Sequence, residues 1–141
     1  MQLILSTDGG ARGNPGPAAA GGVLADARGR VLDSFSHYLG TCTNNVAEYC
    51  ALIEGLERAA HFCASASCSG VEVRMDSELI VKQMRGEYRV RHPQLKPLYD
   101  RARALAEALP CGVSFVHVPR EENKEADRLV NEALDKKAKE R

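Results

Sequence analysis

The stretch STDGGARGNPGPAAAG, Ser6 to Gly21, sets the organisation of the chain. An apolar run, Leu3-Ile4-Leu5, leads straight into Asp8, and glycines and prolines then follow densely. This pattern predicts a strand at residues 3–7 that ends in a Gly/Pro loop. Because Asp-Gly is also a common turn-forming pair, two interpretations of Asp8 stay open: it makes a turn, or it performs chemistry that a turn holds in place.

The rest of the chain alternates between strand and helix patterns. Alternating or apolar runs predict strands at residues 20–26, 31–39, 71–75 and 112–118. Helical periodicity predicts helices at residues 43–62, about 77–87, about 96–109 and 124–139. Three early strands at hairpin spacing imply an antiparallel start, and the order βββαβααβα predicts a mixed sheet covered by helices. The expected fold class is therefore α/β.

Length and composition indicate one ordinary globular domain. The 141 residues, 44% hydrophobic and 27% charged, predict a single domain over residues 1–141, with a Lys/Glu-rich helical tail that frays at about 135–141. No apolar run approaches a membrane span, and the N-terminus lacks the pattern of an export signal. The five cysteines are odd in number and irregularly spaced, which predicts free thiols in a reducing cytoplasm. His61, Cys63 and Cys68 include no CxxC pair, so a zinc site is not expected.

The charge is balanced overall but uneven along the chain. Nineteen basic and nineteen acidic residues cancel, so no global basic signature for a polyanion exists. Residues 82–103 nevertheless hold seven Lys or Arg against Glu87 and Asp100. This local excess could meet a phosphate backbone. The favoured interpretation at this level is plainer, a solvated pair of helices with surface salt bridges.

Four carboxylates lie where solvent-exposed acids are not expected. Asp8 and Asp76 stand at the C-terminal ends of strands, and Glu48 and Asp127 stand on the inward sides of helices. Each has a local alternative: Glu48 could support its helix N-terminus through the dipole, Asp76 could cap a helix, and Asp127 could belong to an acidic first turn with Asn123 as the cap.

Together, these four acids predict a metal site. If the first and fourth strands are neighbours, the four side chains can converge, and their mutual repulsion then needs compensation. Carboxylate oxygens without His or Cys suit Mg²⁺ or Mn²⁺. Two such ions about 3.5–4 Å apart can activate a water and stabilise the leaving oxygen of a phosphodiester.

The order of the motifs resembles a known family. Asp8-Gly9-Gly10 with Gly13-Asn14-Pro15-Gly16-Pro17, Thr43-Asn44-Asn45-x-x-Glu48, Met75-Asp76-Ser77 and Asn123-x-x-Ala126-Asp127 resemble type 1 ribonuclease H, and the match runs from about Leu3 to Leu134. The resemblance implies the ribonuclease H fold, a five-stranded mixed sheet flanked by helices. It also implies an endoribonuclease that hydrolyses the RNA strand of RNA–DNA hybrids, leaving 5′-phosphate and 3′-hydroxyl ends.

The resemblance also assigns roles to individual residues. Asp8, Glu48, Asp76 and Asp127 correspond to the acidic residues that hold two catalytic ions, with Asp8 and Asp76 as the shared ligands. Side chains that resemble contacts to the RNA strand or to a DNA phosphate are Asn14, Thr43, Asn44 and Asn45. An amide donates and accepts, so it can use a 2′-hydroxyl, and a hydroxyl at a helix N-terminus suits a phosphate. Turn and capping roles remain compatible with these contacts.

Several departures from the family pattern bear on substrate binding. The connection at residues 87–98 is short and the chain has no tryptophan, which is typical of a compact subgroup without the basic protrusion that grips the hybrid. Thr41 replaces a frequent arginine of the phosphate pocket. His92 stands where asparagine is frequent, and it could meet a phosphate or simply occupy a surface turn.

The loop before the fourth acid is a further departure, because it lacks the usual histidine, and His117 falls within a predicted strand. Arg120 is the candidate for that loop's role, as a cation near the scissile phosphate; a salt bridge with Glu121 or Glu122 is the alternative.

The expected partner is an RNA–DNA hybrid, bound by a cytoplasmic monomer with no membrane and no protein partner. Two alternatives remain: the same chemistry with relaxed specificity towards duplex RNA or RNA–DNA junctions, and a non-catalytic module that binds hybrids.

Overall fold

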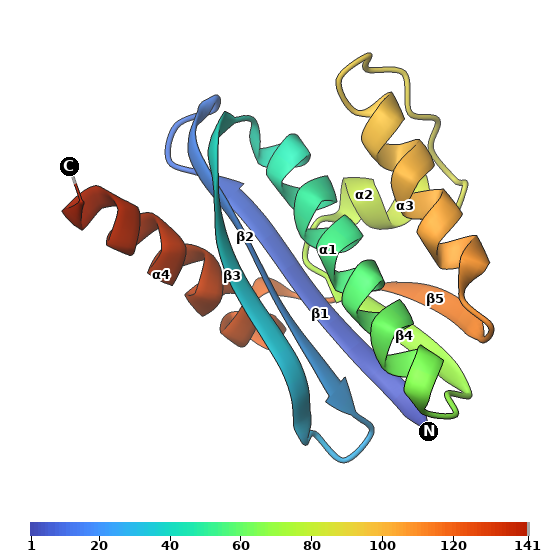
Figure 1. The fold of residues 1–141 in the computed structure, drawn as a ribbon. Helices are drawn as coiled ribbons and strands as arrows, with labels where there is room; N and C mark the ends of the chain where they lie inside the picture. The colour runs from blue at the N-terminus through green and yellow to red at the C-terminus, as the bar shows by residue number, and fades with distance from the viewer. Residues whose placement is uncertain (141) are drawn as a thin grey trace.

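The computed structural model describes residues 1–140 as one five-stranded sheet with helices on both faces (Figure 1). The strand order across the sheet is β3-β2-β1-β4-β5. The strands are β1 Gln2–Ala11, β2 Gly16–Asp26, β3 Val31–Cys42, β4 Gly70–Met75 and β5 Gly112–His117. The helices are α1 Asn44–Ser65, α2 Glu78–Met84, α3 Lys96–Ala108 and α4 Lys124–Lys139, with a 3-10 turn, η1, at Arg120–Glu122.

The central strand β1 joins the two halves of the sheet. It pairs antiparallel with β2 and parallel with β4, and β4 pairs parallel with β5. The expected mixed sheet and the order βββαβααβα are therefore confirmed. The first and fourth strands are neighbours, as convergence of Asp8 and Asp76 requires.

The two faces of the sheet carry different helices. Helices α1, α2 and α3 lie on one side and α4 lies on the other (Figure 1). The main core, which includes Leu3 and Leu5 of β1 and Leu52 and Leu56 of α1, fills the space under α1. A smaller cluster under α4 contains Val130. Because both faces are covered, both helices can bring side chains to the end of β1.

The observed elements differ in length from the sequence prediction. Strand β1 continues to Ala11, so Asp8 lies inside a strand, paired with Gly21, and not in a turn. Glycine and alanine predominate on both sides of this pairing, and their low strand propensity hides the extension from sequence reading. Helix α2 ends at Met84 because Gly86 takes a φ of 79°, a conformation that favours glycine.

The C-terminal tail is helical beyond residue 135, where the sequence predicted that fraying begins. Helix α4 continues to Lys139, whereas residue 141 lies outside the described part of the chain. Fraying of this tail stays a prediction.

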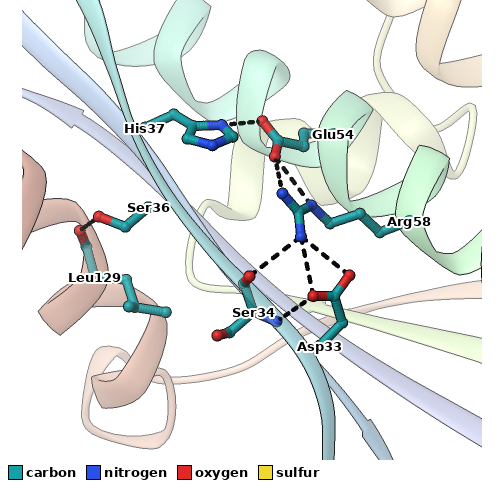
Figure 2. A network of polar contacts seen from close by, with 7 residues as sticks. All are labelled: Asp33, Ser34, Ser36, His37, Glu54, Arg58 and Leu129. Atoms are coloured by element: carbon teal, nitrogen blue, oxygen red, sulfur yellow. Dashed lines mark hydrogen bonds and ion pairs between the residues drawn. The ribbon is translucent and has the colours of Figure 1, made fainter.

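The edge strand β3 is tied to α1 by an ionic network (Figure 2). Arg58 of α1 lies 3.0 Å from both carboxylate oxygens of Asp33, and its other nitrogens donate to Glu54. Glu54 in turn lies 2.6 Å from Nδ1 of His37. These contacts hold the strand that covers the outer side of β2.

The same strand is also tied to α4 on the opposite face. Ser36 donates a 2.6 Å hydrogen bond to the carbonyl of Leu129, which Figure 2 shows beside the ionic network.

No helix among residues 1–140 has the length and apolar character that crossing a membrane would need.

Candidate active site

Three of the four acids meet just beyond the point where β1 and β4 stop pairing. Asp8, Glu48 and Asp76 each place one carboxylate oxygen within 4.8 Å of the others. Asp127 is not part of this close group, but it lines the same cleft of about 370 Å³. Asp8 and Glu48 are only 7% and 8% exposed, so their charges are largely removed from water.

Two glycines allow the helices to approach the central strands closely. A Cβ on Gly9 would lie 2.3 Å from the carbonyl carbon of Ala47 and 2.5 Å from the nitrogen of Glu48. On the other face, a Cβ on Gly21 would lie 2.8 Å from the carbonyl oxygen of Ala126. Both contacts are shorter than real Cβ atoms tolerate, so only glycine lets the Glu48 and Asp127 helices sit this close to the sheet.

Asp76 does not cap helix α2, although its position in the sequence allowed that role. It follows β4 directly, but the N-cap of α2 is Ser77, whose hydroxyl accepts from the N–H of Ile80. The segment after β5 lies against the end of β4, because the N–H of Val118 donates to the carbonyl of Met75 at 2.9 Å. The carboxylate of Asp76 is therefore available to the cleft.

Asn123 has a role that the sequence did not reveal. It occupies the N-cap position of α4, yet its side chain makes no capping bond. Instead its Nδ2 donates to the carbonyl of Thr7 at 2.9 Å, across 116 residues of chain, and the side chain is buried. This bond fixes the start of α4, and so Asp127, beside the residue that precedes Asp8. Its only signal in the sequence is its place in the Asn123-x-x-Ala126-Asp127 motif.

The shared environment changes the proton affinity of two acids. Burial raises the pKa of Asp8 from 3.8 to about 7, and the negative charges of Asp76 and Asp127 act in the same direction. Burial also raises the pKa of Glu48 well above its ordinary value, with the charges of Asp8 and Asp76 adding to the effect. Near neutral pH the cleft therefore carries excess negative charge that only bound cations or protons can relieve.

The donor set fits a hard divalent cation. All the candidate ligands are carboxylate oxygens, and the buried Oε2 of Glu48 has no hydrogen-bond partner among the described residues. A buried acceptor without a donor is costly unless something else satisfies it. Oxygen-only sites suit Mg²⁺ or Mn²⁺.

Arg120 leans towards the cleft and not towards its neighbours. Its Nη2 lies 3.8 Å from Oδ1 of Asp127, and its side chain is 79% exposed. The alternative pairing with Glu121 or Glu122 is not found among the ion pairs of the described residues. Arg120 can thus reach a ligand in the cleft with little cost in broken contacts.

The side-chain oxygens of Asn14 and Asn44 both accept hydrogen bonds from the backbone. Oδ1 of Asn44 accepts from the N–H of Ala11 at 2.8 Å, and Oδ1 of Asn14 accepts from the N–H of Asn44 at 3.1 Å. Their NH₂ groups have no partner among residues 1–140 and can donate to a ligand. Thr43 is the N-cap of α1, and its hydroxyl accepts from Val46.

A second hollow adjoins these residues. His92 lines a space of about 190 Å³ together with Asn14, Thr43 and Asn45. Nδ1 of His92 accepts from the N–H of Gln94, as a turn residue would, and contact with a phosphate stays a prediction.

The basic stretch at residues 82–103 is mostly neutralised. Five of its seven cations form ion pairs with nearby acids, as the interpretation of a salt-bridged surface predicts. Arg89 and Arg91 have no acidic partner within the described chain. A hollow of about 570 Å³ between α3 and β5 is larger than the acidic cleft, but no acid cluster of the described residues lies in it.

Comparison with known proteins identifies the family. A family model described as reverse transcriptase-like matches residues 6–133. A ribonuclease H of Hydrogenovibrio crunogenus is 32% identical over 96% of this chain and 97% of its own length. The chain belongs to the ribonuclease H family. The resemblance in the sequence is thus confirmed for the family.

Solved ribonuclease H structures confirm the fold. LC11-RNase H1, isolated from compost and solved in complex with an RNA/DNA hybrid, superposes with a TM-score of 0.92 at 50% identity, covering 96% of this chain and 99% of the other. A bifunctional protein of Mycobacterium tuberculosis is 44% identical over 96% of this chain. This ribonuclease H-family chain spans only 36% of that relative's length.

Proposed function

We propose that this chain is a metal-dependent endoribonuclease that hydrolyses the RNA strand of RNA–DNA hybrids. The main support for this proposal is the group of Asp8, Glu48 and Asp76, whose carboxylate oxygens lie within 4.8 Å of one another in the cleft that Asp127 also lines. Membership of the ribonuclease H family and similarity to a structure that holds an RNA/DNA hybrid support the choice of substrate.

The four acids would hold two divalent cations, Mg²⁺ or Mn²⁺. Asp8 and Asp76 lie just beyond the paired part of the parallel strands β1 and β4 and would serve both ions, with Glu48 and Asp127 completing the site from opposite faces. When bound, such ions lower the pKa of water and stabilise charge on the leaving oxygen. In the proposed hydrolysis a water oxygen would bond to phosphorus as the P–O3′ bond breaks, and the proton lost by the water would be replaced on O3′ from solvent, which gives a 5′-phosphate and a 3′-hydroxyl.

Other side chains would position the substrate. The free NH₂ groups of Asn14 and Asn44 can donate to ribose hydroxyls or base edges of the RNA strand, and Asn45 lies beside them. Thr43 and His92 share a hollow that suits a phosphate of the DNA strand. Arg120 would supply a positive charge near the scissile phosphate.

The decisive experiment compares labelled substrates of one sequence. In Mg²⁺ or Mn²⁺ we expect cleavage of the RNA strand of a hybrid and no cleavage of duplex DNA. EDTA should stop the reaction, and Asp8→Asn and Asp76→Asn should each lower the rate by at least about 100-fold while circular dichroism stays unchanged.

Other outcomes of this experiment would contradict the proposal. Wild-type rates in either acid variant would remove the proposed site. Hybrid binding without cleavage would favour a non-catalytic module, and equal cleavage of duplex RNA would replace hybrid specificity with relaxed specificity.

A further inference from the structure

The cleft contains a cation that the family motifs do not explain. Arg12 follows β1 directly and lines the cleft together with Asp8, Glu48 and Asp76. Its Nη2 lies 2.6 Å from Oδ1 of Asp135 on α4. The side chain is 45% exposed, so the guanidinium is held by a helix but remains open to solvent.

The contacts of Arg12 leave most of its donors free. Asp135 and Asn131 both accept from Nη2, at 2.6 and 3.3 Å. Within the described chain, Nε and Nη1 have no partner. A guanidinium carries five N–H donors in a planar fork that matches a carboxylate or a phosphate, so Arg12 can keep its contacts with α4 and still bind an anion.

The charge balance of the cleft favours a phosphate as that anion. Among the described residues that line it, Arg12 and Arg120 are the only cations beside four carboxylates. Bound divalent ions would compensate the scissile phosphate, but a polynucleotide brings further phosphates on either side. Each of these needs its own donor or cation to lie near the acids.

The position of Arg12 favours the RNA strand as the source of this phosphate. The N–H of Ala11, directly before Arg12, donates to Asn44, and the N–H of Asn44 donates to Asn14. One chain of hydrogen bonds therefore fixes both the backbone at Arg12 and the amides proposed for the RNA strand. A strand that touches those amides and enters the acidic cleft passes the guanidinium.

We propose that Arg12 binds a non-bridging phosphate oxygen of the RNA strand, next to the scissile phosphate. Asn131 and Asp135 orient the guanidinium, and Asp135 also competes with the substrate for its charge. This inference rests on the proposed hybrid hydrolysis and adds a phosphate subsite to it. The competing explanation is purely structural: Arg12 and Asp135 form an ion pair that ties the end of β1 to α4.

Steady-state cleavage of a hybrid at several salt concentrations tests the subsite. Arg12→Gln should raise KM about 5- to 20-fold with kcat within about two-fold of wild type, because a charge-assisted contact to the bound strand is lost. The slope of log(kcat/KM) against log salt should fall in magnitude by about 1. Arg12→Lys should recover part of the affinity, since it keeps the charge but loses the fork.

Arg28→Gln is the matched control. Arg28 is exposed in the turn between β2 and β3, so the same change of charge there should leave KM and the salt slope at wild-type values. Equal effects of Arg12→Gln and Arg28→Gln would overturn the proposal, because they would report only the net charge of the protein.

Asp135→Asn separates substrate binding from structure. Asparagine can still accept from Nη2, so the arginine keeps its orientation while the competing negative charge disappears, and KM should fall. If Asp135→Asn instead raises KM as Arg12→Gln does, the ion pair itself matters and the phosphate subsite is wrong.

The failure of the two proposals can be told apart. A wild-type protein that cleaves no hybrid contradicts the proposed function. A wild type that cleaves hybrid, with Arg12→Gln matching it in KM and salt slope, overturns only the subsite.

Discussion

Asp8 is subject to two opposing demands. Its place in the acidic cleft suits the proposed role as a cation ligand, yet burial and the charges of Asp76 and Asp127 raise its pKa to about 7. Without a bound cation, ionising Asp8 costs folding free energy. The residue that the proposed chemistry needs most is thus a source of instability in the metal-free protein.

The metal-free protein should lose stability as pH rises. Folded Asp8 keeps its proton up to pH of about 7, whereas an unfolded aspartate releases it near 4, so the folded state binds more protons between these values. Unfolding free energy in EDTA should therefore fall from about pH 4 to about pH 7 and then level off. Urea titrations at pH 5 and pH 8 measure this fall.

Asp8→Asn should remove most of this pH dependence. At pH 8 in EDTA the variant should be about 1–3 kcal/mol more stable than wild type, and Glu48 should account for the slope that remains. Exposed Glu121, changed to Gln, is the control and should leave the slope intact. A variant less stable than wild type at pH 8 would show that Asp8 does not carry this cost.

The sequence allowed the acidic residues of the cleft to be predicted, but not all of the residues that surround them. Asp8 and Asp76 could be placed because both follow apolar strand patterns, and the structure brings them together with Glu48. Their roles as metal ligands remain a prediction. Asn123 was expected only as a cap, since no local pattern reveals a bond to a carbonyl 116 residues away. Arg12 gave no signal, because its partners lie on a helix at the other end of the chain.

At the scale of elements, two small side chains determine how closely the helices approach the sheet. Gly9 admits α1 on one face, and Gly21, paired with Asp8, admits α4 on the other. The order and types of the elements follow from periodicity, which reports apolar faces well. The lengths of β1 and β2 do not, because the glycines, alanines and prolines at residues 8–11 and 16–20 resemble a loop in sequence while lying in strands in the structure.

Gly21→Ala should disturb α4 and the proposed metal site together. The new Cβ would lie 2.9 Å from Cβ of Leu129 and 2.8 Å from the carbonyl of Ala126, so the helix must move. We expect a loss of about 1–3 kcal/mol in unfolding free energy and a smaller gain in Tm on adding Mg²⁺, because Asp127 moves with the helix.

Gly112→Ala provides the matched control for this substitution. A Cβ there meets nothing within 4 Å, so stability should stay within about 0.5 kcal/mol of wild type. Thermal unfolding with and without Mg²⁺ compares both variants. If Gly21→Ala behaves like Gly112→Ala, the close approach of α4 is not required.

At the scale of the whole molecule, the protein carries no net positive charge that would attract a polyanion. The net charge is zero, and five of the seven cations at residues 82–103 are already paired. Arg89 and Arg91 stay unpaired among the described residues, and Arg12 and Arg120 line the cleft. We therefore expect the proposed binding of a hybrid to depend on few phosphate contacts.

The dependence of hybrid binding on salt should accordingly be shallow. If the phosphate contacts come from Arg12, Arg89, Arg91 and Arg120, the slope of log affinity against log salt should be no steeper than about −4 at constant Mg²⁺. Fluorescence anisotropy with the inactive Asp76→Asn variant measures this slope without cleavage. A slope near −8 would mean that the paired arginines and lysines exchange their partners for phosphates.

The hydrogen bond from Asn123 to Thr7 links one end of the domain to the other. During translation, β1, β2, β3 and α1 leave the ribosome long before the segment that carries Asn123 and Asp127. A nascent domain can therefore pair its first strands while its cleft still lacks an entire wall. The proposed active site is therefore complete only after synthesis has reached α4, because Asp127 is carried by that last helix.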